Sequence, residues 1–257
     1  MAAANANLPI INRSPNIPIS FTQLNDRNYY VPDACLDAVC KIQTPIGQGT
    51  AFLLEFSINN EIRRGLFTCH HVACKDQNRC AITPNLSDLT ITLNKEMQPM
   101  NLNWLVRNNA QTISDGTLDF FFVDISTAFQ ANLQDKGIHF LKQGVLKPEE
   151  SFLMVHYGEG RRGVSIVKFI PINAPEETGS PWLNHVAIAG RGSSGAPLIA
   201  SDGTTNGFVV AMNCGQYIST SVNCAVKIKN VLEHIGAQTG QLEPPNVGLA
   251  SQGAGMQ

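Results

Sequence analysis

The chain has 257 residues, of which 43% are hydrophobic and 15% are charged, and its formal net charge is −2 at pH 7. This length and composition are typical of a globular protein with a sizeable core, and the charge excludes the basic footprint of a nucleic-acid or anionic-membrane binder. No apolar run approaches the ~18 residues of a membrane span. We expect no secretory signal, because the first residues lack a charged region followed by an apolar one.

Short apolar runs separated by turn residues follow one another along most of the chain. Residues 1–30, rich in Asn, Pro and Ala, show no sustained period and predict an N-terminal arm. Beyond the arm, short or alternating apolar runs predict β-strands at 38–42, 49–56, 65–69, 89–93, 151–157, 164–170, 185–189, 197–200 and 208–212.

A clear helical period appears near the C-terminal end. Its apolar residues are spaced by three and four positions, at Ile228, Val231, Leu232 and Ile235. Residues 238–257 are rich in Gly, Gln and Pro and predict a flexible tail. Many short strands with one terminal helix predict an all-β domain at 31–237, made of two packed antiparallel barrels at about 31–130 and about 145–230.

Two histidines close the third apolar run, in Thr68-Cys69-His70-His71-Val72. Histidine is the usual general base near neutral pH, so either side chain is a candidate for proton transfer. A carboxylate, Asp119, stands directly before the apolar run at 120–123. Asp115 and Asp124 flank it, but Asp115 lies in a Ser-Asp-Gly sequence typical of a turn, and Asp124 fits a solvated strand edge.

A serine lies among glycines in Gly190-Arg191-Gly192-Ser193-Ser194-Gly195-Ala196. Without a Cβ at Gly192 or Gly195, the backbone can turn sharply and direct its N–H groups toward one point. This is what an activated nucleophile needs, although an ordinary glycine-rich hairpin has the same composition.

In the order His, Asp, Ser, these blocks resemble the trypsin-like serine peptidases over about residues 35–236. The resemblance implies two six-stranded-type barrels, an endopeptidase with polypeptide substrates, and no cofactor or metal. It favours His71 over His70 as the base, with Asp119 orienting the imidazole and Ser194 as the nucleophile. Backbone N–H groups of Gly192 and Ser194 would form the oxyanion hole.

The resemblance also suggests a specificity pocket. Ile188, six residues before Ser194, would form its floor, and the segments 211–213 and 223–225 its walls, which gives Ile188, Ala189, Met212, Asn213 and Ala225 as substrate-binding residues. These residues offer no carboxylate, so an apolar residue before the scissile bond is expected. Ser193 replaces the aspartate that secreted family members use in zymogen activation, so that activation route is not expected.

The cysteines lie at positions 35, 40, 69, 74, 80, 214 and 224, an odd number without a disulfide-type spacing, which predicts reduced thiols and an intracellular, cytoplasmic location. A metal cluster at Cys69, His70, His71, Cys74 and Cys80 is disfavoured because no second ligand pair follows. The G-x-G-x-x-G pattern at 158–163 precedes a β-like run, which indicates a hairpin turn. A non-catalytic binding module with the same fold remains the alternative function.

Overall fold

The structure is a computed structural model that describes residues 33–58, 60–74, 84–94, 98–106, 111–146, 152–170, 179–200, 207–216 and 222–239. The predicted arm at 1–30 lies outside the described residues, as does the predicted tail beyond Thr239. Gln238, the first residue assigned to that tail, instead ends the C-terminal helix.

Short strands dominate the described residues, as the sequence predicts. The strands are β1 (Val39–Thr44), β2 (Gly47–Ile58), β3 (Glu61–Thr68), β4 (Thr90–Leu93), β5 (Met100–Asn101), β6 (Thr112–Asp115), β7 (Phe120–Asp124), β8 (Leu141–Gln143), β9 (Phe152–His156), β10 (Gly163–Phe169), β11 (Trp182–Val186), β12 (Pro197–Ala200), β13 (Phe208–Gln216) and β14 (Asn223–Lys227). The helices are α1 (Asp33–Asp37), α2 (His70–Ala73), α3 (Thr127–Asp135) and α4 (Ile228–Gln238), with 3-10 turns at Leu86–Asp88, Leu102–Trp104 and Gly158–Gly160.

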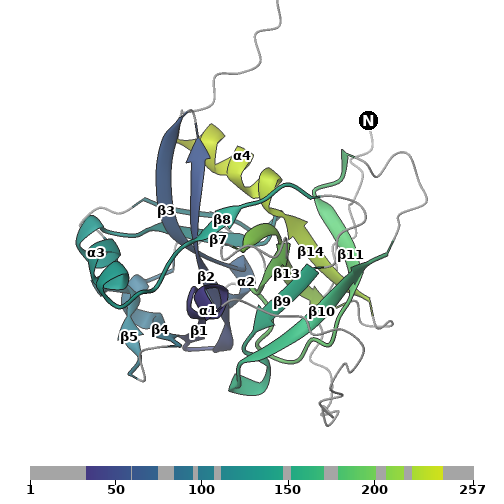
Figure 1. Ribbon diagram of the computed structural model, residues 1–257, viewed down its shortest axis with the longest axis horizontal. Helices are drawn as coiled ribbons and strands as arrows, with labels where there is room; N and C mark the ends of the chain where they lie inside the picture. Colours follow the sequence, from purple (N-terminus) through teal and green to yellow (C-terminus); the bar gives the residue numbers. More distant parts are fainter. Residues whose placement is uncertain are drawn as a thin grey trace, which may run out of the picture.

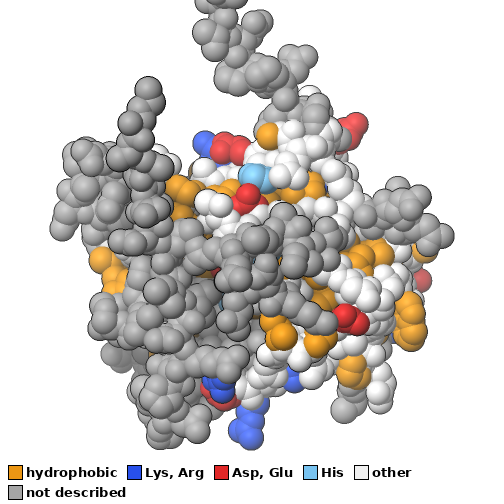
Figure 2. Space-filling view, turned by 180° about the vertical axis from the view of Figure 1, so that it is seen from behind, with side chains coloured by type: hydrophobic (Ala, Val, Ile, Leu, Met, Phe, Trp, Pro, Cys, Tyr) orange, Lys and Arg blue, Asp and Glu red, His pale blue; other side chains and the backbone are white. Residues whose placement is uncertain are grey.

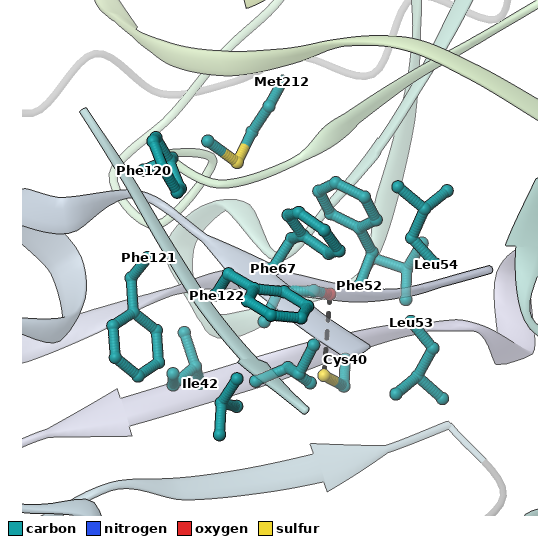
Figure 3. Packing of buried hydrophobic residues seen from close by; sticks show 14 of the residues in the cluster. Cys40, Ile42, Phe52, Leu53, Leu54, Phe67, Phe120, Phe121, Phe122 and Met212 are labelled. Carbon is teal, nitrogen blue, oxygen red and sulfur yellow. Dashed lines mark hydrogen bonds between the residues drawn. The ribbon is translucent and has the colours of Figure 1, made fainter. Parts of the chain in front are cut away.

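The N-terminal barrel is an antiparallel run in the order β5–β4–β1–β2–β3–β7–β6 (Figure 1). Its core contains stacked and edge-on aromatic rings, such as Phe52 and Phe67 with centroids 5.6 Å apart (Figure 3). Strand β7 carries Phe120, Phe121 and Phe122, all fully buried. Because neighbouring side chains on a strand point to opposite faces, both faces of β7 are covered, which explains its continuous apolar run.

The C-terminal barrel closes as a ring of six strands in the order β12–β9–β10–β11–β14–β13, with β13 pairing back to β12. Its interior holds a second apolar cluster that includes Phe152, Met154 and Leu198. Strand β13 serves both barrels, because Met212 packs in the cluster of the N-terminal barrel. The prediction of an all-β fold with two packed barrels is confirmed.

Several elements were not predicted from the sequence, namely strands β5, β6, β8 and β14 and helices α1, α2 and α3. Strand β8 runs parallel between β2 and β13 and so ties one barrel to the other. Helix α3 begins after Ser126, whose Oγ accepts the Phe129 N–H at 3.2 Å. Leu133 is the buried residue of this helix. With a single buried position, the sequence of α3 shows no repeated apolar spacing that would predict a helix.

Helix α4 has the predicted apolar face, with Ile228, Val231, Leu232 and Ile235 buried, and Figure 1 shows it across one end of the barrels. Each helix in the described part of the chain is too short or too polar to span a bilayer. Figure 2 shows the face opposite to Figure 1, where the visible acidic and basic side chains occur singly or in small mixed groups.

Candidate active site

The two adjacent histidines occupy different environments at the end of β3. The hydroxyl of Thr68, the last residue of β3, donates to the carbonyl oxygen of Thr50 at 2.7 Å, which fixes the point where α2 begins. His70 is buried, with 2% of its surface exposed, and its Nδ1 contacts the Ser114 hydroxyl. The His71 side chain retains 29% exposure, so its imidazole reaches the surface between the barrels' loops.

Asp119 holds His71 through both its ring and its backbone. The ring Nδ1 lies 2.8 Å and 3.0 Å from the two carboxylate oxygens, and the His71 backbone N–H donates to Oδ1 at 3.0 Å. An ionised carboxylate only accepts hydrogen bonds, so it selects the tautomer with the proton on Nδ1. The Nε2 lone pair of His71 is therefore left free to accept a proton.

The turn between β6 and β7 positions Asp119. Its backbone has φ +52°, a left-handed conformation that aspartate adopts more readily than most residues. Asp115 accepts the Leu118 N–H at 2.6 Å, and thus has the turn-forming role expected of it. Asp124 forms an ion pair with Arg63, rather than lying at a merely solvated edge.

Thr50 connects the two barrels beneath the serine loop. Its hydroxyl donates to the Gly192 carbonyl oxygen at 2.7 Å and accepts the Tyr157 N–H at 2.9 Å. Its backbone N–H donates to the Ser194 carbonyl oxygen at 2.9 Å. Thr50 is fully buried, so these hydrogen bonds are shielded from water. A strand of the N-terminal barrel therefore fixes the loop that carries Ser194.

Two glycines in this loop are required by its geometry. Gly192 and Gly195 have φ values of +97° and +87°. A Cβ on Gly195 would lie 2.0 Å from the Thr50 carbonyl oxygen, and one on Gly192 would lie 2.6 Å from the Tyr157 carbonyl oxygen. Both distances are far below van der Waals contact, so the loop reaches its position against β2 only because these side chains are absent.

The loop leaves two backbone N–H groups available on the Ser194 side. The N–H groups of Ser193, Gly195 and Ala196 donate to Gly190, Asn213 and Ser193 carbonyl oxygens. Those of Gly192 and Ser194 have no hydrogen-bond acceptor among the described residues. These are the two groups expected to form the oxyanion hole.

The Ser194 hydroxyl lies between the barrels but is not bonded to His71. Its Oγ donates to the Cys214 carbonyl oxygen at 3.3 Å, and within the described ranges no hydrogen bond joins it to the His71 ring. The structure thus joins the first two members of the predicted triad directly. The third lies in a loop that is hydrogen-bonded to β2 and β13, and its hydroxyl donates to the Cys214 carbonyl oxygen.

Thiols surround the carboxylate. Possible ligand atoms of Cys69, Asp119 and Cys214 lie within 4.8 Å of one another, a grouping that the sequence did not suggest. Burial raises the pKa of both thiols above their usual value, which keeps them protonated. The Sγ of Cys69 donates to the Asn213 carbonyl oxygen at 3.3 Å. Of the cluster weighed from the sequence, Cys74 contacts the Ser114 hydroxyl at 3.7 Å, and Cys80 lies outside the described residues.

The predicted specificity residues are divided between surface and interior. Ile188 is 50% exposed, and Ala189 is partly buried. Met212, Asn213 and Ala225 are fully buried on β13 and β14. An exposed side chain does not fill the bottom of a pocket, so the geometry gives no support to Ile188 as its floor.

Thr50 and the side-chain contacts of Asn213 were not predicted from the sequence. The Asn213 amide donates to the Ser193 carbonyl oxygen at 3.0 Å, directly before the candidate nucleophile. Thr50 lies in the Gly-Gln-Gly-Thr segment before the histidines, but only its contacts across the barrel interface reveal its role. A buried polar residue in an otherwise apolar strand was the signal available for both.

Neither a protein-family model nor a curated protein matches this sequence. Solved structures do. The active form of the Rv3671c protease of M. tuberculosis has 18% identity and a TM-score of 0.52, covering 93% of this chain and 96% of that one. The serine protease domain of the Sesbania mosaic virus polyprotein has 19% identity and a TM-score of 0.50, covering 77% and 92%.

The HtrA-type protease AlgW with a tripeptide has 16% identity and a TM-score of 0.53, covering 82% of this chain and 63% of that one. The chain therefore has the fold of the trypsin-like serine proteases, as the sequence blocks predicted. At these identities the likeness is one of fold.

Proposed function

We propose that this chain is a serine endopeptidase that works through His71, Asp119 and Ser194 and an acyl-enzyme intermediate. The observation that carries the proposal is the clamp of Asp119 on His71. Two contacts to Nδ1 and one to the backbone N–H orient the ring and fix its tautomer. A structural histidine needs no such double fixation, whereas a general base does.

In the proposed mechanism, the Ser194 hydroxyl turns from the Cys214 carbonyl oxygen toward His71 and attacks the scissile carbonyl carbon. His71 Nε2 takes the hydroxyl proton, and Asp119 stabilises the resulting imidazolium. The negative oxygen of the tetrahedral intermediate accepts hydrogen bonds from the Gly192 and Ser194 N–H groups. His71 then gives its proton to the leaving amine, and a water molecule activated by His71 hydrolyses the acyl-enzyme.

Serine, rather than cysteine, is assigned as the nucleophile because the neighbouring thiols are buried and protonated. A thiol attacks as its thiolate, and burial raises the pKa of Cys69 and Cys214 away from that form. Cys40, Cys69, Cys74, Cys214 and Cys224 are free thiols, and the compartment that we propose is a reducing, intracellular one.

A fluorophosphonate probe tests the proposal, because it labels only activated serines. We expect the full chain to be labelled at Ser194, and the Ser194→Ala variant to be neither labelled nor able to cut peptides. His71→Ala should lose at least about 10³-fold in turnover. His70→Ala, at the buried neighbour, should lose much less once its folding has been verified by its melting temperature.

The alternative is a binding module that keeps the fold without catalysis, and the Ser194 hydroxyl bonded to Cys214 favours it. A folded wild-type chain that takes up no probe and cuts no peptide would establish this alternative. Equal sensitivity of His70 and His71, with both variants folded, would contradict the assignment of the base.

A further inference from the structure

Three polar side chains lie fully buried inside the C-terminal barrel. His185 on β11 is the direct cross-strand partner of Asn223 on β14, so the two side chains project from the same face, about 5 Å apart at Cβ. Asn213 on β13 pairs with Ala225, two residues from Asn223, and also faces inward. Their exposed fractions are 0% for His185 and Asn213 and 1% for Asn223.

The hydrogen bonds of Asn213 decide which ring nitrogen of His185 carries the proton. The Asn213 amide nitrogen donates to the Ser193 carbonyl oxygen, so its Oδ1 is an acceptor. His185 Nε2 lies 3.1 Å from that oxygen and must donate to it. Burial lowers the pKa of His185 to about 4, so the ring is neutral at pH 7. Its Nδ1 is therefore a lone-pair acceptor, and no donor among the described residues bonds to it.

Asn223 presents a second acceptor of the same kind. Its amide nitrogen donates to the Ala187 carbonyl oxygen at 3.1 Å, and within the described ranges its Oδ1 has no hydrogen-bond donor. A buried acceptor without a donor raises the free energy of the folded chain. Two such acceptors on facing strands would therefore be stabilised by one group that donates to both. Each is buried below the surface, so any group that satisfies them must enter the barrel.

This pair lies directly behind the candidate nucleophile. The Asn213 side chain joins His185 to Ser193, and the Asn213 backbone carbonyl accepts the Gly195 N–H at 2.8 Å. The segment after β11, tied to Asn223 through Ala187, leads straight into the serine loop. The buried polar and charged residues of this barrel, as far as it is described, include no carboxylate.

We infer that His185 Nδ1 and Asn223 Oδ1 form the base of the primary specificity pocket and select a primary carboxamide, the side chain of glutamine or asparagine, before the scissile bond. The inference rests on the proposed peptidase function and names its substrate class. A carboxamide NH₂ has two N–H donors for two acceptors. A carboxylate would place acceptors against acceptors, and an ammonium group would be buried without a counter-ion. An aliphatic side chain would leave both acceptors unpaired.

The test compares peptides that differ only in the residue before the scissile bond: Gln, Asn, Glu, Leu or Lys. For the wild-type chain, kcat/KM should be about 10²-fold or more higher for Gln or Asn than for Leu. Product peptides ending in the same residues, titrated calorimetrically into the Ser194→Ala chain, should show the same order of affinity. This second readout needs no turnover, so it separates failure of the pocket from failure of catalysis.

Substitutions of His185 and Asn223 test whether these two residues cause the preference for a carboxamide side chain. His185→Phe and Asn223→Leu should each bring the Gln-to-Leu ratio of kcat/KM toward one. Val186→Ala, which changes the exposed neighbour of His185 on the same strand, should leave that ratio unchanged. The ratio is measured within one preparation, so a loss of folded protein does not alter it.

Three results would overturn the inference. Preference for Leu would mean that a buried water satisfies the two acceptors and that the pocket floor is apolar. Preference for Lys would require an acidic group in the pocket. Preference for Glu over Gln would require a protonated His185. If product peptides show the carboxamide order but the fluorophosphonate probe does not label Ser194, the pocket is correct and the proposed catalysis is not.

Discussion

Asp119 distinguishes two histidines that are adjacent in the chain. Consecutive residues in α2 point in different directions, so His70 turns into the N-terminal barrel and His71 toward the surface. The carboxylate of Asp119 contacts the ring Nδ1 of His71, and it also accepts the backbone N–H of that residue. The backbone hydrogen bond holds the carboxylate beside His71, and the contacts of Nδ1 with both carboxylate oxygens set the orientation of the ring.

Thr50 offers a test of how the serine loop is positioned. Thr50→Val keeps the shape of the side chain but removes the hydroxyl that joins Gly192 and Tyr157. We expect kcat to fall by at least about tenfold, because each unmade buried hydrogen bond costs roughly 1–3 kcal/mol. Thr50→Ser keeps the hydroxyl and should retain most of the activity. Equal losses in the two variants would show that the methyl group, rather than the hydrogen bonds, matters.

At the scale of elements, the serine loop and β2 approach each other more closely than any side chain permits. Gly195→Ala places a methyl group 2.0 Å from the Thr50 carbonyl oxygen at a φ of +87°. We expect the variant to unfold at lower denaturant concentration and to lose fluorophosphonate labelling, because the loop must move away from β2.

Gly47→Ala is the matched control for this change, since a Cβ on Gly47 meets nothing within 4 Å. Its stability and labelling should match those of the wild type. If Gly195→Ala behaves like Gly47→Ala in both measurements, the loop is not held against β2 as described.

The stability of the whole molecule depends on pH through two buried, neutral histidines in the C-terminal barrel, His156 and His185. His156 accepts the Gly158 N–H at Nδ1 and contacts the Ser165 hydroxyl, which donates to the Ile188 carbonyl oxygen at 2.7 Å. Burial lowers the pKa of His156 and of His185 to about 4. An unfolded histidine titrates near ~6.5.

Stability should therefore decline with acid. Below about pH 6.5 both histidines bind protons in the unfolded chain but remain neutral in the folded chain. They therefore destabilise the fold progressively as the pH falls toward about 4. Above about pH 7 both states are neutral and this effect is absent. Each histidine contributes at most ~1.4 kcal/mol per pH unit to the slope of unfolding free energy against pH.

Urea unfolding of the wild type and of His156→Gln at pH 7, 6 and 5 measures this slope. The variant should show the smaller decrease, because it lacks one of the two groups. His139→Gln, at an exposed position, controls for the removal of a histidine as such. An unchanged slope in His156→Gln would mean that His156 binds protons equally well in the folded and the unfolded chain.

The fold class, most of the strands and the terminal helix could be predicted from the sequence, and the candidate triad was assigned from it as well. These features are local or ordered along the chain: alternating apolar runs, helical spacing at 228–235, and blocks in the order His, Asp, Ser. The expected preference for apolar residues before the scissile bond depended on Ile188 as the pocket floor. Ile188 was chosen by counting six residues back from Ser194, and its exposure in the structure gives no support to that choice.

The contacts between the barrels and the residues behind Ser194 depend on packing, and the sequence did not predict them. Strand β8 is too short to show a recognisable strand pattern in the sequence. It forms because its backbone pairs with both β2 and β13. The sequence does not predict the hydrogen bonds of Thr50, Asn213, His185 and Asn223, because their partners lie 20 or more residues away along the chain. A hydrogen bond depends on distance in space, and that distance is fixed by packing rather than by sequence separation.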